Sequence, residues 1–264
     1  MGLRPLVGQR LWRERNRRDV HLQRRRPPRR HEDRSPQAPR QGLSLNYLAH
    51  SLAFIDDGAD DGLRFYRVAG TSLPDWLRVV DKHARLRPDV LAAVDVGDDA
   101  RFDALREGAQ RHHDDDHRFH LDEAFDVHSA DLAARFRLFA PGLRASTLGH
   151  ILTEMLVDAA LMQRDPTLLP RYYAGLASLD DDVIVAFSRR ATQRPLSTLP
   201  LLLQRFRNSR FLELYASDDG LLDCLVGVCE RAGLVPPPRS STALIAQART
   251  EVAPIVARFF GASS

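Results

Sequence analysis

The stretch GHILTEMLVDAALM, residues 149–162, carries apolar side chains around most of its circumference when it is wound as a helix. A helix that is apolar on nearly all sides belongs in a protein interior. In the flanking chain the apolar residues recur at helical spacing, and no segment sustains the alternation of apolar and polar residues that is typical of a strand. The sequence therefore predicts an all-α protein, a single bundle of many helices built around this one.

Three polar residues interrupt this apolar stretch at intervals of four. His150, Glu154 and Asp158 lie on one face of the expected helix. Burying two carboxylates without partners costs several kcal/mol each, so the sequence implies compensation by a metal ion, by arginine or by histidine. A metal site and an internal salt-bridge network are both open at this point.

A second set of residues has the same spacing. His112, Asp116 and His120 share one face of a helix expected over 100–120. Imidazole and carboxylate are ligands that Zn, Fe and Mn accept, and two of them one turn apart can chelate a single ion. The alternative is a solvated, charged helix that happens to be rich in histidine.

Two further metal candidates precede these sets. His50 interrupts an apolar segment at 46–54, and Asp75 follows Leu-Pro within GTSLPDW, residues 70–76, which we expect to form a turn. Each has a structural alternative, a hydrogen-bonded core histidine for His50 and a helix N-cap for Asp75. Together with the two sets above, His50 and Asp75 indicate a metal site, because a binuclear site needs a bridging carboxylate and ligands from several helices.

The remaining elements follow from caps, breakers and apolar spacing. We expect helices at 46–54, 100–120, 121–139, 146–162, 166–178, 180–190, 196–215, 218–232 and 241–260, a short apolar segment at 63–69 and a loop at 56–62. Three regions are expected: an Arg-rich tail over 1–42, an all-helical metal-site domain over 43–238 and a C-terminal helix over 239–264.

The N-terminal tail differs from the rest in composition. Residues 1–40 hold 13 arginines and four acidic residues, a net charge of +9, whereas residues 41–264 hold 25 basic and 31 acidic residues, a net of −6. With few apolar residues to offset the entropy of ordering, the tail is expected to be disordered. It could be an arm for nucleic acid or an acidic partner, or it could precede a native start near residue 43 or 45. The acidic remainder argues against nucleic-acid binding elsewhere on the surface.

Arg205, Arg207 and Arg210 form a third candidate cluster. The planar guanidinium suits phosphate oxygens, so this segment is a candidate for binding the phosphate of a substrate. The alternative is again a solvated helix face.

Several classes of protein are disfavoured by what the sequence lacks. It contains no nucleophile elbow, Walker loop or dinucleotide glycine fingerprint, which argues against serine hydrolases, P-loop enzymes and Rossmann oxidoreductases. Cys224 and Cys229, five apart in an apolar run, are expected to be buried thiols that pack separately. No apolar stretch is long enough for a bilayer and the N-terminus lacks the apolar region of a secretory signal, so we expect a cytoplasmic protein with no membrane partner.

Four motifs together resemble a known family. NYLAH at 46–50, GTSLPDW at 70–76, His112 with Asp116, and EMLVD at 154–158 are similar in order and spacing to motifs of acyl-carrier-protein phosphodiesterases. That family belongs to the wider HD-domain-like metal phosphohydrolases, and the resemblance covers about residues 45–165. It implies an HD-domain-like all-α fold, a divalent metal such as Mn or Mg, and phosphodiester hydrolysis.

The resemblance also assigns roles by position. It carries metal-site roles over to His50, Asp75, His112, Asp116 and Asp158, with Glu154 matching an acidic residue one turn before the last of these. The chain departs from the family pattern at His113, which replaces an arginine, at Ala159, which replaces a histidine, and in a missing Thr-Asp motif downstream. The acidic charge of residues 41–264 also differs from the basic surface that an acidic carrier protein would require.

These observations combine into one working hypothesis. One or two divalent ions (Mn, Mg, Fe or Zn) lower the pKa of a water toward about 7 and polarise a phosphoryl group, while Asp115 or Glu154 orients that water or takes its proton. The expected substrate is a phosphorylated small molecule or a phosphopantetheine-type phosphodiester. The competing hypothesis is a non-enzymatic helical protein whose buried histidines and carboxylates form an ion-pair network that serves structure or partner binding.

Overall fold

The computed structural model describes residues 46–56, 62–139 and 143–261. The chain divides into two units, Met1–Arg40 and Gln41–Ser264, and all described residues belong to the second. The expected Arg-rich tail and most of the expected loop at 56–62 therefore lie outside the described residues.

Every regular element in the described ranges is helical, which confirms the predicted all-α class. The α-helices are α1 (Tyr47–Ile55), α2 (Arg64–Val80), α3 (Pro88–Ala93), α4 (Ala100–His120), α5 (Glu123–Arg137), α6 (Ala145–Arg164), α7 (Leu168–Ala177), α8 (Asp181–Thr192), α9 (Leu199–Ser209), α10 (Asp218–Ala232), α11 (Thr242–Glu251) and α12 (Ala253–Phe260). Short 3-10 helices span Phe211–Ala216 (η2) and Arg239–Ser241 (η3).

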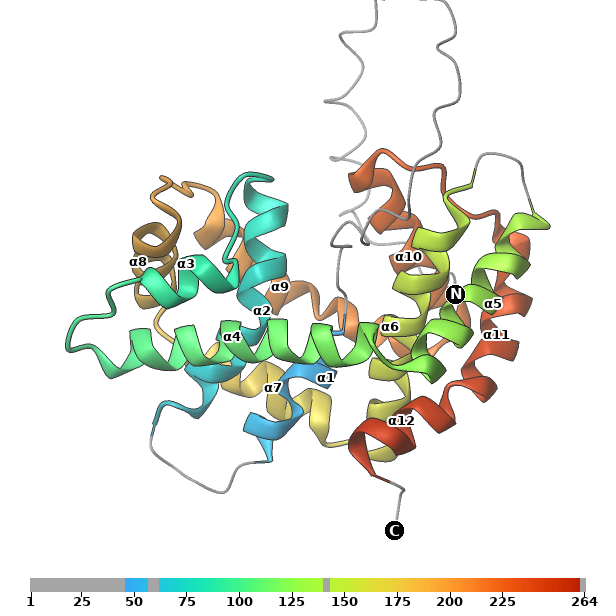
Figure 1. The fold of residues 1–264 in the computed structure, drawn as a ribbon, viewed down its shortest axis with the longest axis horizontal. Helices are drawn as coiled ribbons and strands as arrows, with labels where there is room; N and C mark the ends of the chain where they lie inside the picture. Colours follow the sequence, from blue (N-terminus) through green and yellow to red (C-terminus); the bar gives the residue numbers. More distant parts are fainter. Residues whose placement is uncertain (1–45, 57–61, 140–142, 262–264) are drawn as a thin grey trace, which may run out of the picture. The chain divides into compact units, whose positions relative to one another are not determined.

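Helix α4 connects the two ends of this unit. Its N-terminal end lies beside α3 and α8, and its C-terminal end reaches α5 and the region of α6 (Figure 1). The side chain of Asp99 caps its first turn by accepting the N–H of Arg101, and the side chain of Asp122 caps α5 in the same way. Because one straight helix spans both neighbourhoods, residues a turn apart on α4 can meet side chains from different helices.

Glycines allow two helix pairs to approach closely. A Cβ on Gly108 of α4 would overlap the backbone carbonyl of Arg67 in α2, and a Cβ on Gly149 of α6 would overlap that of Ser129 in α5. Only glycine fits where backbone meets backbone. These contacts set the positions of α4 and α6, the two helices that carry most of the candidate site residues.

The prediction of a turn at residues 70–76 is wrong. GTSLPDW lies in the middle of α2, which runs through Pro74 without a break. Proline in a helix interior removes one backbone hydrogen bond and favours a kink. Here Leu73 and Leu77, both fully buried, lie in the same core as the rest of α2, so tertiary packing outweighs the local breaker. Asp75 is accordingly a mid-helix residue, and the N-cap alternative is excluded.

Other bounds differ in smaller ways. The helices predicted at 100–120 and 218–232 have those bounds in the structure, whereas the helix predicted at 196–215 ends at Ser209 because Arg210 adopts a left-handed backbone, φ 44°. The helix predicted at 241–260 is two helices, α11 and α12, divided at Val252 just before Pro254. The short α3 went unpredicted, although Pro88 at its first turn is a start signal.

The C-terminal segment packs on the core. Helix α11 contacts α6 and α10, and α12 contacts α5 and α6. The residues predicted as a separate C-terminal helix over 239–264 thus belong to the same contact unit as the helices before them. Buried residues of all these helices contribute to one hydrophobic core.

Candidate metal centre

One face of α4 supplies the middle of the site. His112, Asp116 and His120 lie one turn apart, as their spacing predicts. The structure does not bring all predicted ligands to one point. It distributes five of the seven predicted ligands, together with Glu154, over two groups of three, and each group has donor atoms within 4.8 Å of one another.

Group one consists of His50 from α1 with His112 and Asp116 from α4. His50 Nε2 lies 3.3 Å from Asp116 Oδ1, and His112 Nε2 lies 3.5 Å from Asp116 Oδ2. The centroids of the two imidazole rings are 4.4 Å apart. With metal–donor bonds of 2.0–2.1 Å at tetrahedral angles, two donor atoms stand about 3.3 Å apart. These separations are those of ion pairs, and they also suit donors around one cation.

Burial and charge act on group one in opposite directions. His50 and His112 are almost fully buried, at 1% and 3% exposure. Burial lowers the pKa of His50, but hydrogen bonds to Asp115 and Asp116 outweigh it and raise that pKa to about 10. Burial, together with the positive charge of His50, lowers the pKa of His112 to about 3. Without a cation, His50 is therefore protonated and His112 is neutral at pH 7.

Asp116 is the carboxylate at the centre of this arrangement. Burial raises its pKa, but three histidines outweigh burial and hold that pKa well below its ordinary value: His112, which is itself charged at such low pH, then His50 through a hydrogen bond and its charge, and then His120. Burial lowers the pKa of His150 in α6, but a hydrogen bond to Glu154, the charge of Glu154 and then the charge of Asp116 outweigh burial and raise that pKa. Asp116 is thus ionised and within electrostatic range of histidines from both groups.

Group two consists of His120 from α4 with His150 and Glu154 from α6. His150 Nε2 lies 3.2 Å from Glu154 Oε1, and His120 Nε2 lies 4.0 Å from the same oxygen. The ring centroids of the two histidines are 4.7 Å apart. Glu154 is buried, whereas the histidine side chains keep 29% and 27% exposure, so this group opens to the surface.

Asp158 has a role that sequence reasoning missed. Its two carboxylate oxygens accept the backbone N–H groups of Leu48 and Ala49, at 2.9 and 2.8 Å. Asn46, at the N-cap position of α1, makes no side-chain cap bond, so Asp158 caps α1 from another helix. Burial raises the pKa of Asp158 to about 7, against the lowering effect of these two hydrogen bonds. The metal-ligand role predicted for Asp158 is not seen in either group of three.

Asp75 lies near both groups without belonging to either. It is 5% exposed, and burial followed by the negative charges of Asp116 and Glu154 raises its pKa well above the ordinary value. The positive charge of His50 acts in the opposite direction. Asp75 is therefore a buried carboxyl group beside the two groups, with its protonated form favoured by burial.

Asp115, one of the two residues predicted to orient or activate water, has arginine partners. Arg111 Nε donates to Asp115 Oδ2 at 2.8 Å, and Arg118 donates to Oδ1 at 3.3 Å. The same Oδ2 lies 3.6 Å from His50 Nδ1, on the side of the ring away from Asp116. Asp115 thus faces the outer nitrogen of His50. The Arg111 partner could have been found from its spacing of four from Asp115.

The arginines predicted to bind phosphate lie elsewhere. Arg207 makes two hydrogen bonds of 2.5 Å to Asp181, and Arg210 pairs with Glu213 at 2.5 Å and stacks over Tyr173. Arg205 is exposed. Phosphate binding by this cluster stays a prediction, with two of its three guanidinium groups already paired with carboxylates.

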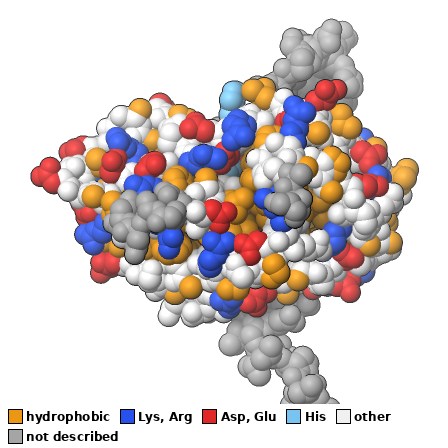
Figure 2. All heavy atoms as spheres, turned by 90° about the horizontal axis from the view of Figure 1, so that it is seen from below, with side chains coloured by type: hydrophobic (Ala, Val, Ile, Leu, Met, Phe, Trp, Pro, Cys, Tyr) orange, Lys and Arg blue, Asp and Glu red, His pale blue; other side chains and the backbone are white. Residues whose placement is uncertain are grey.

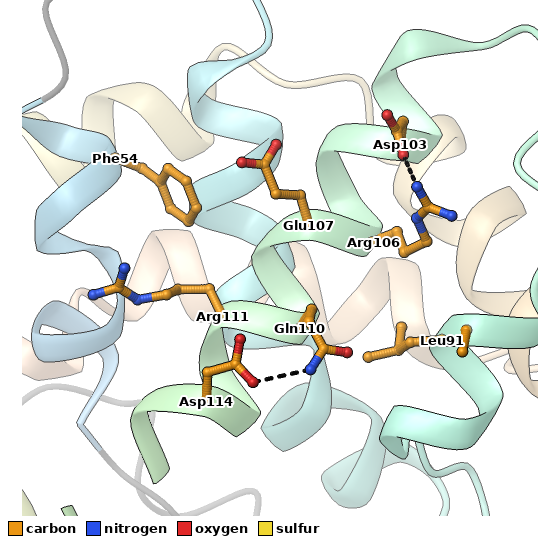
Figure 3. Close-up of a pocket in the computed structure, with 9 residues that line it drawn as sticks. Phe54, Leu91, Asp103, Arg106, Glu107, Gln110, Arg111 and Asp114 are labelled. Carbon is orange, nitrogen blue, oxygen red and sulfur yellow. Dashed lines mark hydrogen bonds and ion pairs between the residues drawn. The ribbon is translucent and has the colours of Figure 1, made fainter. Parts of the chain in front are cut away.

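A groove along the outer side of α4 was also not predicted. It has a volume of about 540 Å³ and is walled by Phe54 of α1 and by Leu91 and Ala92 of α3. Charged side chains of α4 form its floor, and Figure 3 shows Arg106 with Asp103 and Gln110 with Asp114 as paired neighbours. The groove residues, with the walls, are Phe54, Leu91, Ala92, Asp103, Arg106, Glu107, Gln110, Arg111 and Asp114. Three acidic and two basic side chains line the groove, so it has no preference for an anion.

One face of the surface carries charges of both signs, and the two cysteines are not bonded to each other. Figure 2 shows arginine and acidic side chains interspersed over one face, with no single-sign patch in that view. Cys224 and Cys229 are free thiols, partly and fully buried. Among the described helices, none has both the length and the apolar character needed to traverse a bilayer.

Comparison of the chain with protein-family models, with curated proteins and with solved structures found no match. The resemblance to acyl-carrier-protein phosphodiesterases and to HD-domain-like hydrolases therefore stays a prediction from four short motifs.

Proposed function

We propose that the helical core binds a divalent cation through His50, His112 and Asp116 and hydrolyses a phosphoester. The observation that carries this proposal is the convergence of donors from two helices at separations of 3.3 and 3.5 Å, close to the spacing of about 3.3 Å expected for two donors on one cation. A divalent ion held there would polarise a phosphoryl oxygen and lower the pKa of a water to about 7.

The protein's own residues prepare this site in two ways. Asp115 faces the outer nitrogen of His50, an arrangement in which a carboxylate fixes the orientation of a metal-binding histidine. Asp158 holds the first turn of α1, and with it His50, against α6. With Arg111 and Arg118 on its oxygens, Asp115 is better suited to positioning than to accepting a proton.

The donor set also bears on the reaction. Two imidazoles and one carboxylate leave at least one coordination position for water or substrate, as in catalytic rather than structural sites. A mixed nitrogen and oxygen set accepts Mn, Fe and Zn. Phosphoesters are the substrates that the four motifs favour. Assays decide whether the substrate is a phosphomonoester or a phosphodiester.

Metal content and activity test the proposal together. Protein purified without chelators is analysed for bound metal, then assayed with p-nitrophenyl phosphate and bis-p-nitrophenyl phosphate in the presence of Mn, Mg, Zn or Fe. We expect metal-dependent turnover that His112→Ala abolishes and that His117→Ala retains, since His117 is an exposed histidine on the same helix. A wild-type protein that binds none of these metals overturns the proposal.

One observation favours a second candidate, a structural ion-pair network. His50, protonated between Asp115 and Asp116, already pairs with one buried and one partly buried carboxylate without any cation. In that case these side chains specify how α1 packs against α4, and the protein is a binding or structural module in place of an enzyme. The two candidates differ in one measurement, because only the metal site makes thermal stability rise when a divalent cation is added.

A further inference from the structure

We infer that His120, His150 and Glu154 form a second cation site, separate from group one and suited to a transition-metal ion such as Zn²⁺. The three residues come from α4 and α6, and their donor atoms lie within 4.8 Å of one another. Neither His120 nor His150 belongs to the four motifs on which the family resemblance rests. The site extends the proposed function, but its existence is tested independently of it.

The geometry of group two fits a cation. The separation of 3.2 Å between His150 Nε2 and Glu154 Oε1 is close to the spacing of about 3.3 Å expected for two donors on one ion. His120 Nε2 stands 4.0 Å from the same oxygen, too far for a hydrogen bond. This nitrogen is buried and has no hydrogen-bond partner among the described residues. A cation between the three side chains supplies the partner that His120 lacks.

The surroundings hold the two rings in place. Phe125 of α5, which is 2% exposed, packs against both imidazoles, with ring centroids 6.0 Å from His120 and 5.3 Å from His150. Fixing the rings before the ion arrives reduces the entropy lost on binding. The partial exposure of both histidines gives an ion a route from solvent.

The donor chemistry indicates which ions are preferred. Two imidazole nitrogens suit Zn, Fe and similar ions, whereas Mg and Ca prefer sites made of oxygen ligands. Three protein ligands also leave one tetrahedral position free for water or a substrate oxygen. Group two therefore has the composition of a site that takes part in chemistry or substrate binding.

The position of group two gives the inference its functional meaning. His120 follows Asp116 by four residues on α4, a rise of about 6 Å along the helix. The ions of two-metal sites stand about 3.5–4 Å apart, so an ion at group two would act on a different part of a substrate from an ion at group one. The inferred arrangement makes Glu154 an ion ligand, in place of the proton-accepting role predicted from the sequence.

Zn²⁺ stoichiometry of the full chain tests the inference. Isothermal titration and metal analysis of dialysed protein are expected to give two ions per chain for wild type and one for His150→Ala. His112→Ala is expected to keep one ion, held by group two, and the double variant is expected to keep none. His117→Ala is the matched control and is expected to keep two. Circular dichroism at 222 nm confirms that each variant is folded, and Glu154→Gln repeats the test with nearly unchanged shape.

The outcomes separate this inference from the proposed function. Loss of one ion in His150→Ala, with one ion retained in His112→Ala, supports the second site. If wild type binds a single ion that survives His150→Ala and disappears in His112→Ala, the inference is overturned while group one stands. If the single ion shows the reverse pattern, group two is a site and the proposed function loses its cation.

Discussion

Replacing Asp158 should separate a structural role from a metal-binding one. The carboxylate of this fully buried residue on α6 accepts the N–H groups of Leu48 and Ala49, which lie just before His50 in α1. Helix α1 has no side-chain cap of its own at Asn46. Asp158→Ala therefore removes both acceptors at once and leaves two buried donors without partners.

The expected loss of stability follows from those two donors. A buried N–H left unsatisfied costs about 1–3 kcal/mol, so Asp158→Ala should lower the free energy of unfolding by about 2–6 kcal/mol. Asp158→Asn keeps one carbonyl oxygen as an acceptor but places an NH₂ group against the other donor. Its loss should be roughly half as large, about 1–3 kcal/mol.

Urea denaturation followed by circular dichroism measures these losses, with Asp114→Ala, an exposed residue on α4, as the control. Metal titration of the same variants measures the affinity of group one, which depends on the position of His50. If α1 is displaced, this affinity should fall by about 10–100-fold. The reasoning is refuted if Asp158→Ala costs less than about 1 kcal/mol. It also fails if Asp158→Asn keeps nearly full stability yet loses the ion, because that result identifies Asp158 as a ligand.

Three further predictions test the frame and the site. Gly108→Ala should lower the free energy of unfolding by about 2 kcal/mol in urea, because a backbone clash of about 3 kcal/mol outweighs a helix-propensity gain of about 1. Gly227→Ala, whose Cβ would meet only the flexible end of Arg231, should be neutral or stabilising and so serves as its control. Zn²⁺ at 100 times its dissociation constant should stabilise wild type by about 2.7 kcal/mol, seen as a higher Tm, and equal Tm values with and without Zn²⁺ would contradict a metal site. Arg207→Ala and Asp181→Ala should each cost about 1 kcal/mol in urea unfolding, and two null results would show that this half-buried ion pair contributes no stability.

Much of the helical arrangement could be predicted, because helical spacing is a local property of the chain. The apolar stretch at 149–162 predicted a buried helix, and α6 is that helix. The fourfold spacing of His112, Asp116 and His120 predicted that they share a face of α4, and they do. The turn predicted at residues 70–76 failed because Pro74 is read locally as a breaker, whereas its helix is held by buried neighbours that the local sequence does not reveal.

Which side chains meet across helices could not be predicted in the same way. Spacing shows that Asp158 lies on the same face of α6 as Glu154, but the partner that each receives depends on which helix end comes close. The N-terminal end of α1 meets Asp158, so that carboxylate becomes a cap. Glu154, one turn earlier, meets His150 and His120 instead.

The arrangement on α4 explains why one predicted site is two groups in the structure. A helix places successive members of a fourfold series about 6 Å apart along its axis, which is too far for three of them to share one ion without help from other helices. His50 of α1 complements the first two members, and α6 complements the third. Asp116, the middle member, is ionised and interacts electrostatically with histidines of both groups. A cation bound at one group partly neutralises the charge of Asp116 and so reduces its attraction for a cation at the other group. The affinities of the two groups for cations should therefore be coupled, and Asp116→Asn should weaken binding at both.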